Sequence, residues 1–207
     1  MNNKYNPSDL PSGVFALINN GVVNTNNISK RPGTTGSNVV VVSGTFLGGT
    51  AFEPSGGTKL QVVCLNGASN ARLYTSSDGT TFSAIGSANL LNDAQMNFVQ
   101  ASNRLFGFNG TQVVDVASDG TTVTVDRAGV PKGKFGFWFH NYLFVSGVTA
   151  TPNRLFWSAL GDPTTFDSND FVDINANDGD SITGLNAFND TLIVAKNNTM
   201  SSIGGFS

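Results

Sequence analysis

Cysteine, histidine and glutamate each occur once in the 207 residues, as Cys64, His140 and Glu53, and only 12% of the chain is charged. A single cysteine excludes an internal disulfide, and a single histidine supplies no cluster for a metal ion. Because Glu, Lys and Arg usually cover the exposed surfaces of helices, their scarcity argues against long helices.

Long hydrophobic segments are also missing. The longest aliphatic run is Val39–Val42, far below the roughly 20 apolar residues that span a bilayer. The first residues, Met1–Pro7, contain no apolar stretch of the kind found in secretory signals. We therefore expect no membrane contact, and we expect the chain to be made in a reducing cytoplasm.

Positive charge is scarce as well. The formal net charge is −3 and the sequence pI is about 4.9. A chain of this kind offers no cationic field to phosphate backbones or to anionic lipid. Sequence-specific nucleic-acid binding is therefore disfavoured.

The residues that are plentiful favour β-structure. The chain has 24 glycines and 16 phenylalanines, and it is rich in Asn, Thr and Ser. Thr, Val and Phe suit the pleated surface of a sheet, whereas Asn, Asp and Gly suit the turns between strands. The composition predicts an all-β protein.

The chain divides into two regions by composition. Residues 1–38 are rich in Asn, Pro and Gly and are interrupted by one apolar patch at Val14–Ile18. We expect an extended N-terminal arm with one strand or short helix at that patch. Regular structure is expected to begin at Val39, and residues 39–207 form the β-domain.

A short phrase recurs along residues 39–207. It ends in Leu followed by an aromatic or aliphatic residue, and it occurs at Ala71–Tyr74, Asn103–Phe106, Asn141–Phe144, Asn153–Phe156 and Asp190–Ile193. Each phrase opens a predicted strand, and most of these strands are followed by a turn signal and a second β-forming run. The sequence therefore predicts antiparallel meander hairpins built from related units.

The intervals between these units are near the roughly 40 to 50 residues of propeller blades. We therefore predict propeller-like blades, about three to four complete or partial ones, with a β-sandwich as the alternative. So few blades do not close a ring when four to eight are usual. Either the chain is part of a longer polypeptide, or partners cover the edges of its sheets.

Two sets of residues are candidates for structural positions in the blades. Ser76–Phe82 resembles the Asp-box turn of sialidase-type propellers, in which Asp78 would lock the turn, although it is one residue short. Arg72, Arg104 and Arg154 occupy equivalent positions in the recurring phrase. Glu53 lies in a Gly-rich loop, so the tyrosine, glutamate and arginine cluster that a sialidase needs is not expected.

The segment Asp173–Asp180 alternates Asp and Asn oxygens, which suit a hard cation such as calcium. Its register lacks the glycine at position 6 and the glutamate at position 12 of a calcium loop. We interpret it as an Asx-rich turn between strands, and a structural cation held by Asp178 and Asp180 stays open. His140 is expected at a strand end or in the core, and Cys64 as a small buried hydrophobic residue.

Three stretches, taken in order, resemble the virion tail proteins of tailed bacteriophages that form a propeller in the head-to-tail or tail-nozzle assembly, including the packaged-DNA stabilisation type. They are Ile28–Gly33, Pro131–Phe166 and Asp178–Gly204. This resemblance implies a non-enzymatic structural protein of the virion head-to-tail connector, tail hub or nozzle. It would form part of the DNA conduit or plug through subunit interfaces.

The resemblance also implies partners. We expect a cyclic homo-oligomer in the virion tail, in contact with other tail or portal-adaptor proteins and with DNA passing through non-specifically. No catalytic residue, cofactor or metal is expected. The arm residues of interest are Lys30, Arg31, Pro32 and Gly33. Either this basic segment contacts an adjoining subunit, or Lys30 and Arg31 only flank a turn at Pro32 and Gly33.

The residues expected to hold the blades together are two turn aspartates, two aromatic residues and the three arginines: Asp78, Asp162, Trp157, Phe166, Arg72, Arg104 and Arg154. The alternative function is a glycan- or protein-binding propeller module that serves host recognition. Aromatic residues at exposed hairpin tips would favour it. Trp138 and Trp157 instead lie within predicted strands, which argues against stacking on carbohydrate.

Overall fold

The computed structural model describes residues 21–24, 27–30, 44–176 and 178–205. The chain divides into two units, Met1–Ser37 and Asn38–Ser207. The described part is all-β and contains no helix. The sequence-based prediction of an all-β chain is therefore confirmed.

The first unit contains a two-stranded hairpin. Strand β1 (Gly21–Asn24) pairs antiparallel with β2 (Asn27–Lys30). This hairpin precedes Val39, the expected start of regular structure. Its strands contain Val22, Val23 and Ile28, and the β-forming tendency of these three residues explains the hairpin within an otherwise polar segment.

The second unit contains four antiparallel sheets in its described residues, and in each of them consecutive strands are neighbours. The first two sheets consist of β3 (Phe46–Phe52), β4 (Leu60–Leu65), β5 (Ala71–Ser76) and β6 (Ser83–Leu90), followed by β7 (Asn97–Ala101), β8 (Arg104–Phe108), β9 (Val113–Val116) and β10 (Val123–Val125).

The third sheet also has four strands and the last has three. They consist of β11 (Phe135–Phe139), β12 (Tyr142–Val148), β13 (Thr151–Trp157) and β14 (Phe171–Asp173), followed by β15 (Ile182–Phe188), β16 (Thr191–Lys196) and β17 (Met200–Ile203). The predicted meander hairpins are therefore present, including the pairing of β12 with β13. These two strands extend past a bulge beside Gly147, where φ is +74°, as far as the pair Val148 and Thr151.

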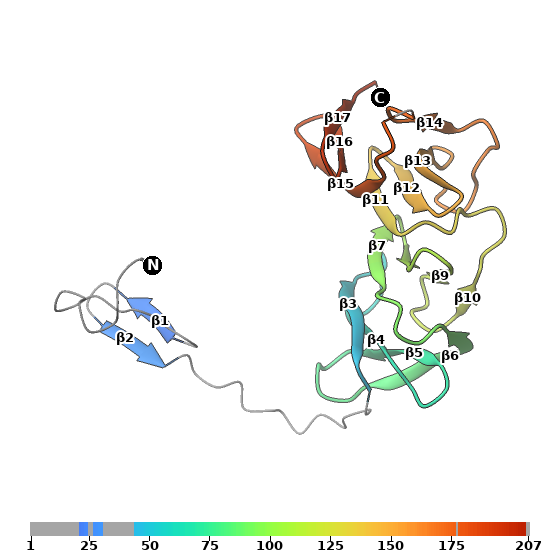
Figure 1. Cartoon of the computed structure of the whole chain (residues 1–207). Coiled ribbons are helices and arrows are strands. Elements are labelled where there is room, and N and C mark those ends of the chain that lie inside the picture. Colours follow the sequence, from blue (N-terminus) through green and yellow to red (C-terminus); the bar gives the residue numbers. More distant parts are fainter. Residues whose placement is uncertain (1–20, 25–26, 31–43, 177, 206–207) are drawn as a thin grey trace. The chain divides into compact units, whose positions relative to one another are not determined.

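The sheets follow one another along the unit in chain order, with β3–β6 at one end and β15–β17 at the other (Figure 1). The first strands of consecutive sheets lie side by side, β3 with β7, β7 with β11, and β11 with β15. Each sheet therefore packs mainly on the sheet before it and the sheet after it.

Three hydrophobic clusters fill the three spaces between consecutive sheets. Strand β8 shows how one sheet serves two of them: Leu105 belongs to the cluster shared with the first sheet, whereas Phe106 and Phe108 belong to the cluster shared with the third. Successive side chains of a strand point to opposite faces. The uninterrupted apolar runs of the inner strands therefore supply two cores at once.

Candidate functional site

The turn at Asp78 joins the third and fourth strands of the first sheet. One carboxylate oxygen of Asp78 accepts hydrogen bonds from the backbone N–H groups of Thr80 and Thr81 and from the Ser76 hydroxyl, each at 2.8 Å. The two backbone bonds, that of Thr81 foremost, hold the pKa of Asp78 far below its usual value. The carboxylate therefore stays ionised and locks the turn.

The same turn recurs in the next two sheets. Asp119 accepts hydrogen bonds from the N–H groups of Thr121 and Thr122, and Asp162 from the N–H and hydroxyl of Thr164. Both turns again follow the third strand of their sheet. Sequence reasoning missed this repeat, although Asp-x-Thr-Thr is visible in the sequence at all three places.

An apolar residue follows each Asp-x-Thr-Thr turn at the same offset. These residues are Phe82, Val123 and Phe166, and Val123 and Phe166 pack against hydrophobic clusters. The first three sheets therefore share this turn together with the apolar residue after it.

Arg72, Arg104 and Arg154 do not occupy equivalent positions, which corrects the interpretation of the recurring phrase. Arg104 lies on the second strand of its sheet, whereas Arg72 and Arg154 lie on the third strands of theirs. The phrase opens β5, β8, β12 and β16, whereas in β13 it begins at the third residue of the strand. It occurs twice in the third sheet, on β12 and on β13, so it does not identify one position in a sheet.

Two of these arginines bind carboxylates through two parallel hydrogen bonds. Arg104 donates to buried Asp115 from Nε and Nη2, at 2.8 Å each, and Arg127 reaches the same carboxylate at 2.7 Å. Arg154 donates to Asp173 at 2.7 and 2.8 Å across the β13–β14 pair. The hydrogen bonds from Arg154 hold the pKa of Asp173 below its usual value.

The remaining arginine is exposed. Arg72 has no ion pair among the described residues. Together with Tyr74 and the loop 67–70 it lines a polar hollow of about 320 Å³ on the first sheet. Arg72 is therefore available to a ligand or partner, whereas Arg104 and Arg154 serve the fold.

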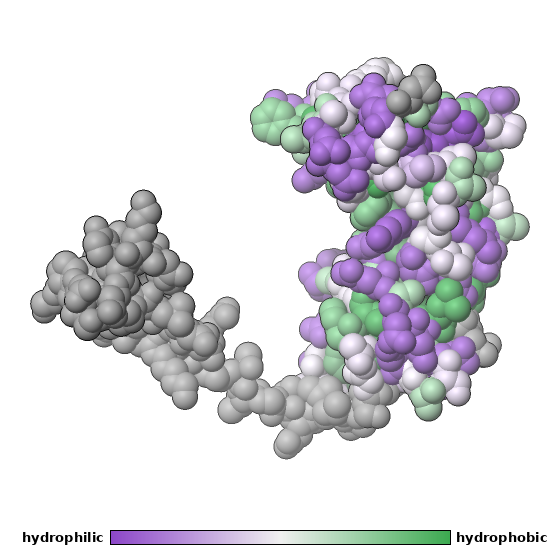
Figure 2. Space-filling model, viewed as in Figure 1, coloured by the Kyte–Doolittle hydropathy of each residue, from purple (hydrophilic) through white to green (hydrophobic). Residues whose placement is uncertain are grey.

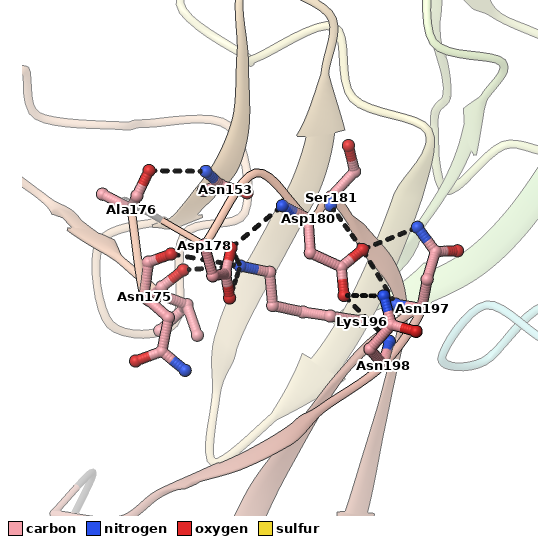
Figure 3. A network of polar contacts seen from close by, with 10 residues as sticks. Asn153, Asn175, Ala176, Asp178, Asp180, Ser181, Lys196, Asn197 and Asn198 are labelled. Carbon is pink, nitrogen blue, oxygen red and sulfur yellow. Dashed lines mark hydrogen bonds and ion pairs between the residues drawn. The ribbon is translucent and has the colours of Figure 1, made fainter.

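The side chain of Lys196 lies beside the acidic loop at Asp178 and Asp180. Its fully buried ammonium donates to both carboxylate oxygens of Asp178, at 2.6 and 2.8 Å, and to the carbonyls of Ile174 and Asn175 (Figure 3). The ammonium thus occupies the position that a cation would take between these oxygens. Lys196 is the principal cause of the lowered pKa of Asp178.

Asp180 points to the other side of this loop. Its carboxylate accepts hydrogen bonds from the backbone N–H groups of Ser181, Asn197 and Asn198 and from the Asn197 amide. The bond from the Asn198 N–H is the main reason why the pKa of Asp180 lies below its usual value. The segment is therefore an Asx-rich connection fixed to the β16–β17 turn. In the described part of the chain, no three His, Cys, Asp or Glu side chains are grouped to hold a metal ion.

The single histidine and the single cysteine lie in different surroundings. His140 is exposed in the turn between β11 and β12, with φ of +48°, and its Nε2 lies 3.5 Å from an oxygen of Asp190. It is a strand-end residue. Cys64 is fully buried in β4, and this burial raises the pKa of its thiol to about 11.

Most of the predicted aromatic positions support the packing between sheets. Trp157 packs on the cluster between the third and fourth sheets, and Trp138 and Phe166 on the cluster between the second and third. Of the predicted arm contacts, Lys30 ends strand β2. Arg31, Pro32 and Gly33 lie outside the described residues.

No protein-family model matches the chain, and no curated protein matches its sequence. In the described residues, no helix has the length and apolar character needed to cross a membrane. Among the described residues, the polar clusters pair most of their charges within the chain. The outer faces of the first and last sheets, the first including the hollow at Arg72, are open surfaces.

Proposed function

We propose that this chain is a structural protein of a tailed-bacteriophage virion, in the head-to-tail connector, tail hub or nozzle, and that it has no enzymatic activity. Its sheets would be propeller-like blades in a cyclic homo-oligomer. In this role it contributes through subunit interfaces to the conduit or plug for the packaged DNA, beside other tail or portal-adaptor proteins.

The observation that carries the proposal is that the carboxylates of the polar clusters are bound by groups of the same chain. Asp115, Asp173 and Asp178 each bind a cationic side chain of the same chain, and Asp78 and Asp180 bind backbone N–H groups. These groups stabilise turns and strand pairs. Such an arrangement suits a rigid building block whose function lies in its outer surfaces.

The charge balance supports the same role. With a net charge of −3, the chain releases few counterions from DNA and does not attract the phosphate backbone. A conduit wall must let DNA slide past, and weak adhesion favours sliding. Purified protein should therefore show no binding to duplex DNA at physiological salt in a filter-binding assay.

The virion assignment is tested on the phage that encodes the chain. Antibodies against the purified protein should label purified particles at the head–tail junction or tail nozzle. An amber codon in the gene should yield, in a non-suppressing host, particles that lack tails or lose their packaged DNA. Growth in a suppressing host is the control. Label at the tail-fibre tips, or infectious particles without the protein, would disprove the assignment.

One observation favours the alternative, a glycan- or protein-binding module. Phe188 is 70% exposed at the end of β15, immediately before the turn to β16, and exposed aromatic rings at hairpin tips stack on sugars. A glycan array probed with the purified chain separates the two functions. Specific glycan retention that Phe188→Ala abolishes would support the alternative.

A further inference from the structure

The four sheets of the second unit differ in how many of their faces are covered. In the inner sheets, β8 and β9 are buried along almost their whole length, because alternate residues enter the clusters on both sides. In the outer sheets, buried residues of β4 and β16 alternate with half-buried or exposed ones. The first and last sheets therefore each leave one face uncovered by the described residues.

The uncovered face of the last sheet is an apolar groove. It has a volume of about 400 Å³ and includes Gly184, Ile193 and Ala195 in its lining. Phe188 and Met200 also line it and are 70% and 73% exposed. Figure 2 shows hydrophobic surface at this end of the unit, over β15–β17. No charged side chain lines the groove.

The uncovered face of the first sheet carries an exposed aromatic residue, Phe46. Gly49 of β3 pairs with Val63, and Val63 pairs with Tyr74, so these residues form one row across the face. The ring of Phe46 lies against Gly49, and Phe46 is 63% exposed. Leu65 pairs with both Phe46 and Arg72, so exposed Arg72 and the polar hollow that it lines with Tyr74 lie on this face as well. The face therefore presents one exposed aromatic ring beside a polar hollow.

We propose that the two outer faces bind each other between copies of this chain, with Phe46 of a second copy seated in the groove of the last sheet. Inside the chain, each of the first three sheets already packs face to face on the sheet that follows it. A fourth contact of the last sheet with the first sheet of another copy continues the same packing. Burial of the exposed phenylalanines and Met200 supplies the favourable free energy.

The contact joins two different surfaces, so it is heterologous and its repetition generates a ring or a filament. It defines the subunit interface of the proposed cyclic assembly and in that sense rests on the proposed function. The groove has room for the Phe46 ring of the second copy because Gly184 has open space around it. A groove facing a second groove would leave both phenylalanine projections unburied, which disfavours a symmetric dimer.

The test uses the full chain and two variants with complementary defects. Phe188→Asp/Met200→Asp damages the groove and keeps Phe46, whereas Phe46→Asp damages the projection and keeps the groove. Sedimentation velocity should show concentration-dependent oligomers for the natural chain. The self-association affinity of each variant alone should fall by about 30-fold or more, which is the loss expected for a central contact residue.

Mixing the two variants gives the decisive reading. One intact groove and one intact projection should form a 1:1 complex and nothing larger. A natural chain that stays monomeric at every concentration would overturn the proposal, and so would self-association by either variant at full strength. Thermal unfolding followed by circular dichroism identifies a variant that fails to fold, and Phe46→Ala and Met200→Ala then replace the aspartates.

Leu160→Asp is the matched control, because Leu160 is 62% exposed and follows β13 outside both faces. It should leave association unchanged, and an equal loss would point to non-specific hydrophobic contact. The result is independent of the virion experiment. If the two variants form a complex and antibodies do not label virions, the contact stands and the virion assignment falls. If antibodies label virions and the two variants form no complex, the virion assignment stands and the contact falls.

Discussion

Asp115 is a fully buried carboxylate held by the Arg104 guanidinium through two hydrogen bonds of 2.8 Å each. Arg127 adds a third contact at 2.7 Å. This arrangement fixes the start of β8 to β9 and to the segment after β10. All three side chains come from the second sheet and the segment that follows it.

Replacing Asp115 with alanine should lower the free energy of unfolding by about 3–5 kcal/mol, because two guanidinium groups lose the carboxylate that neutralises them. Guanidinium-chloride unfolding followed by tryptophan fluorescence measures the change. The control is Glu53→Ala, whose partner Lys59 is as exposed as Glu53 itself, 66% for both side chains. This exposed pair should contribute less than about 1 kcal/mol, and equal losses in the two variants would contradict the structural role of Asp115.

The turn at Asp119 should make stability depend on pH. Hydrogen bonds from the Thr122 hydroxyl and from the N–H groups of Thr122 and Thr121 lower the pKa of Asp119 to about 2. Because the pKa is lower in the folded chain, the stabilisation is fully present above the unfolded value near about 4 and is lost as pH falls through about 2. Asp119→Asn should be less stable than the natural chain at pH 6, and the difference should become small by about pH 2.

Urea unfolding at several pH values checks this expectation. Ser118→Ala, an uncharged change beside the same turn, serves as the control and should give an offset that does not vary with pH. A difference between Asp119→Asn and the natural chain that stays constant from pH 6 to pH 2 would show that the carboxylate does not lock the turn.

Replacement by alanine should have a large effect on stability at one strand glycine and almost none at another. A Cβ atom at Gly136 of β11 would lie 2.4 Å from Phe108, whereas one at Gly184 of β15 would have nothing within 4 Å. Gly136→Ala should therefore destabilise the chain by about 1–3 kcal/mol through overpacking between the second and third sheets. Gly184→Ala should change the free energy of unfolding by no more than about 0.5 kcal/mol.

Chemical denaturation of dilute protein compares the two variants. Similar losses at both positions would mean that the strand backbone itself requires glycine, and that close packing between the sheets is not the cause.

The buried Lys196 ammonium makes the acidic loop independent of added metal. The midpoint of thermal unfolding should be the same with EDTA as with millimolar calcium. Lys196→Met should lower the free energy of unfolding by about 2 kcal/mol, since the buried carbonyl of Ile174 loses its donor. Lys132→Met, at an exposed ion pair with Asp126, is the control and should have a smaller effect. A lower midpoint with EDTA would show that the loop holds a metal ion.

The thiol of Cys64 should react only after unfolding. It is fully buried and its pKa is raised to about 11 by that burial, so almost no thiolate exists at neutral pH and reagents do not reach it. Ellman's reagent should label no thiol in the native chain within an hour and one thiol in 6 M guanidinium chloride. Rapid labelling of native protein would indicate that β4 opens locally.

The strands and hairpins could be predicted from the sequence because their signals are local. Alternation, turn residues and β-propensity are enough to predict the pairing of β8 with β9 and of β16 with β17, and both pairs are present. The position of each strand within its sheet could not be read in the same way. Arg104 and Arg154 hold the same place in two copies of the recurring phrase, yet Arg104 lies on the second strand of its sheet and Arg154 on the third strand of another.

The polar clusters depend on contacts between distant segments. Lys196 reaches Asp178 only because the β16–β17 turn folds onto the acidic loop, and neither residue shows this in its own neighbourhood of the sequence. The true repeat is nevertheless visible in the sequence. Asp-x-Thr-Thr begins at Asp78, Asp119 and Asp162, and it aligns the first three sheets correctly because it follows the third strand in each of them.

Lys196 places a positive charge permanently beside the oxygens of Asp178. A dissolved ion can be washed away by dilution or removed by a chelator, but a side chain stays attached to its backbone. The loop between β14 and β15 should consequently keep its shape in fresh water, in seawater or in a cell, whatever the ionic composition outside.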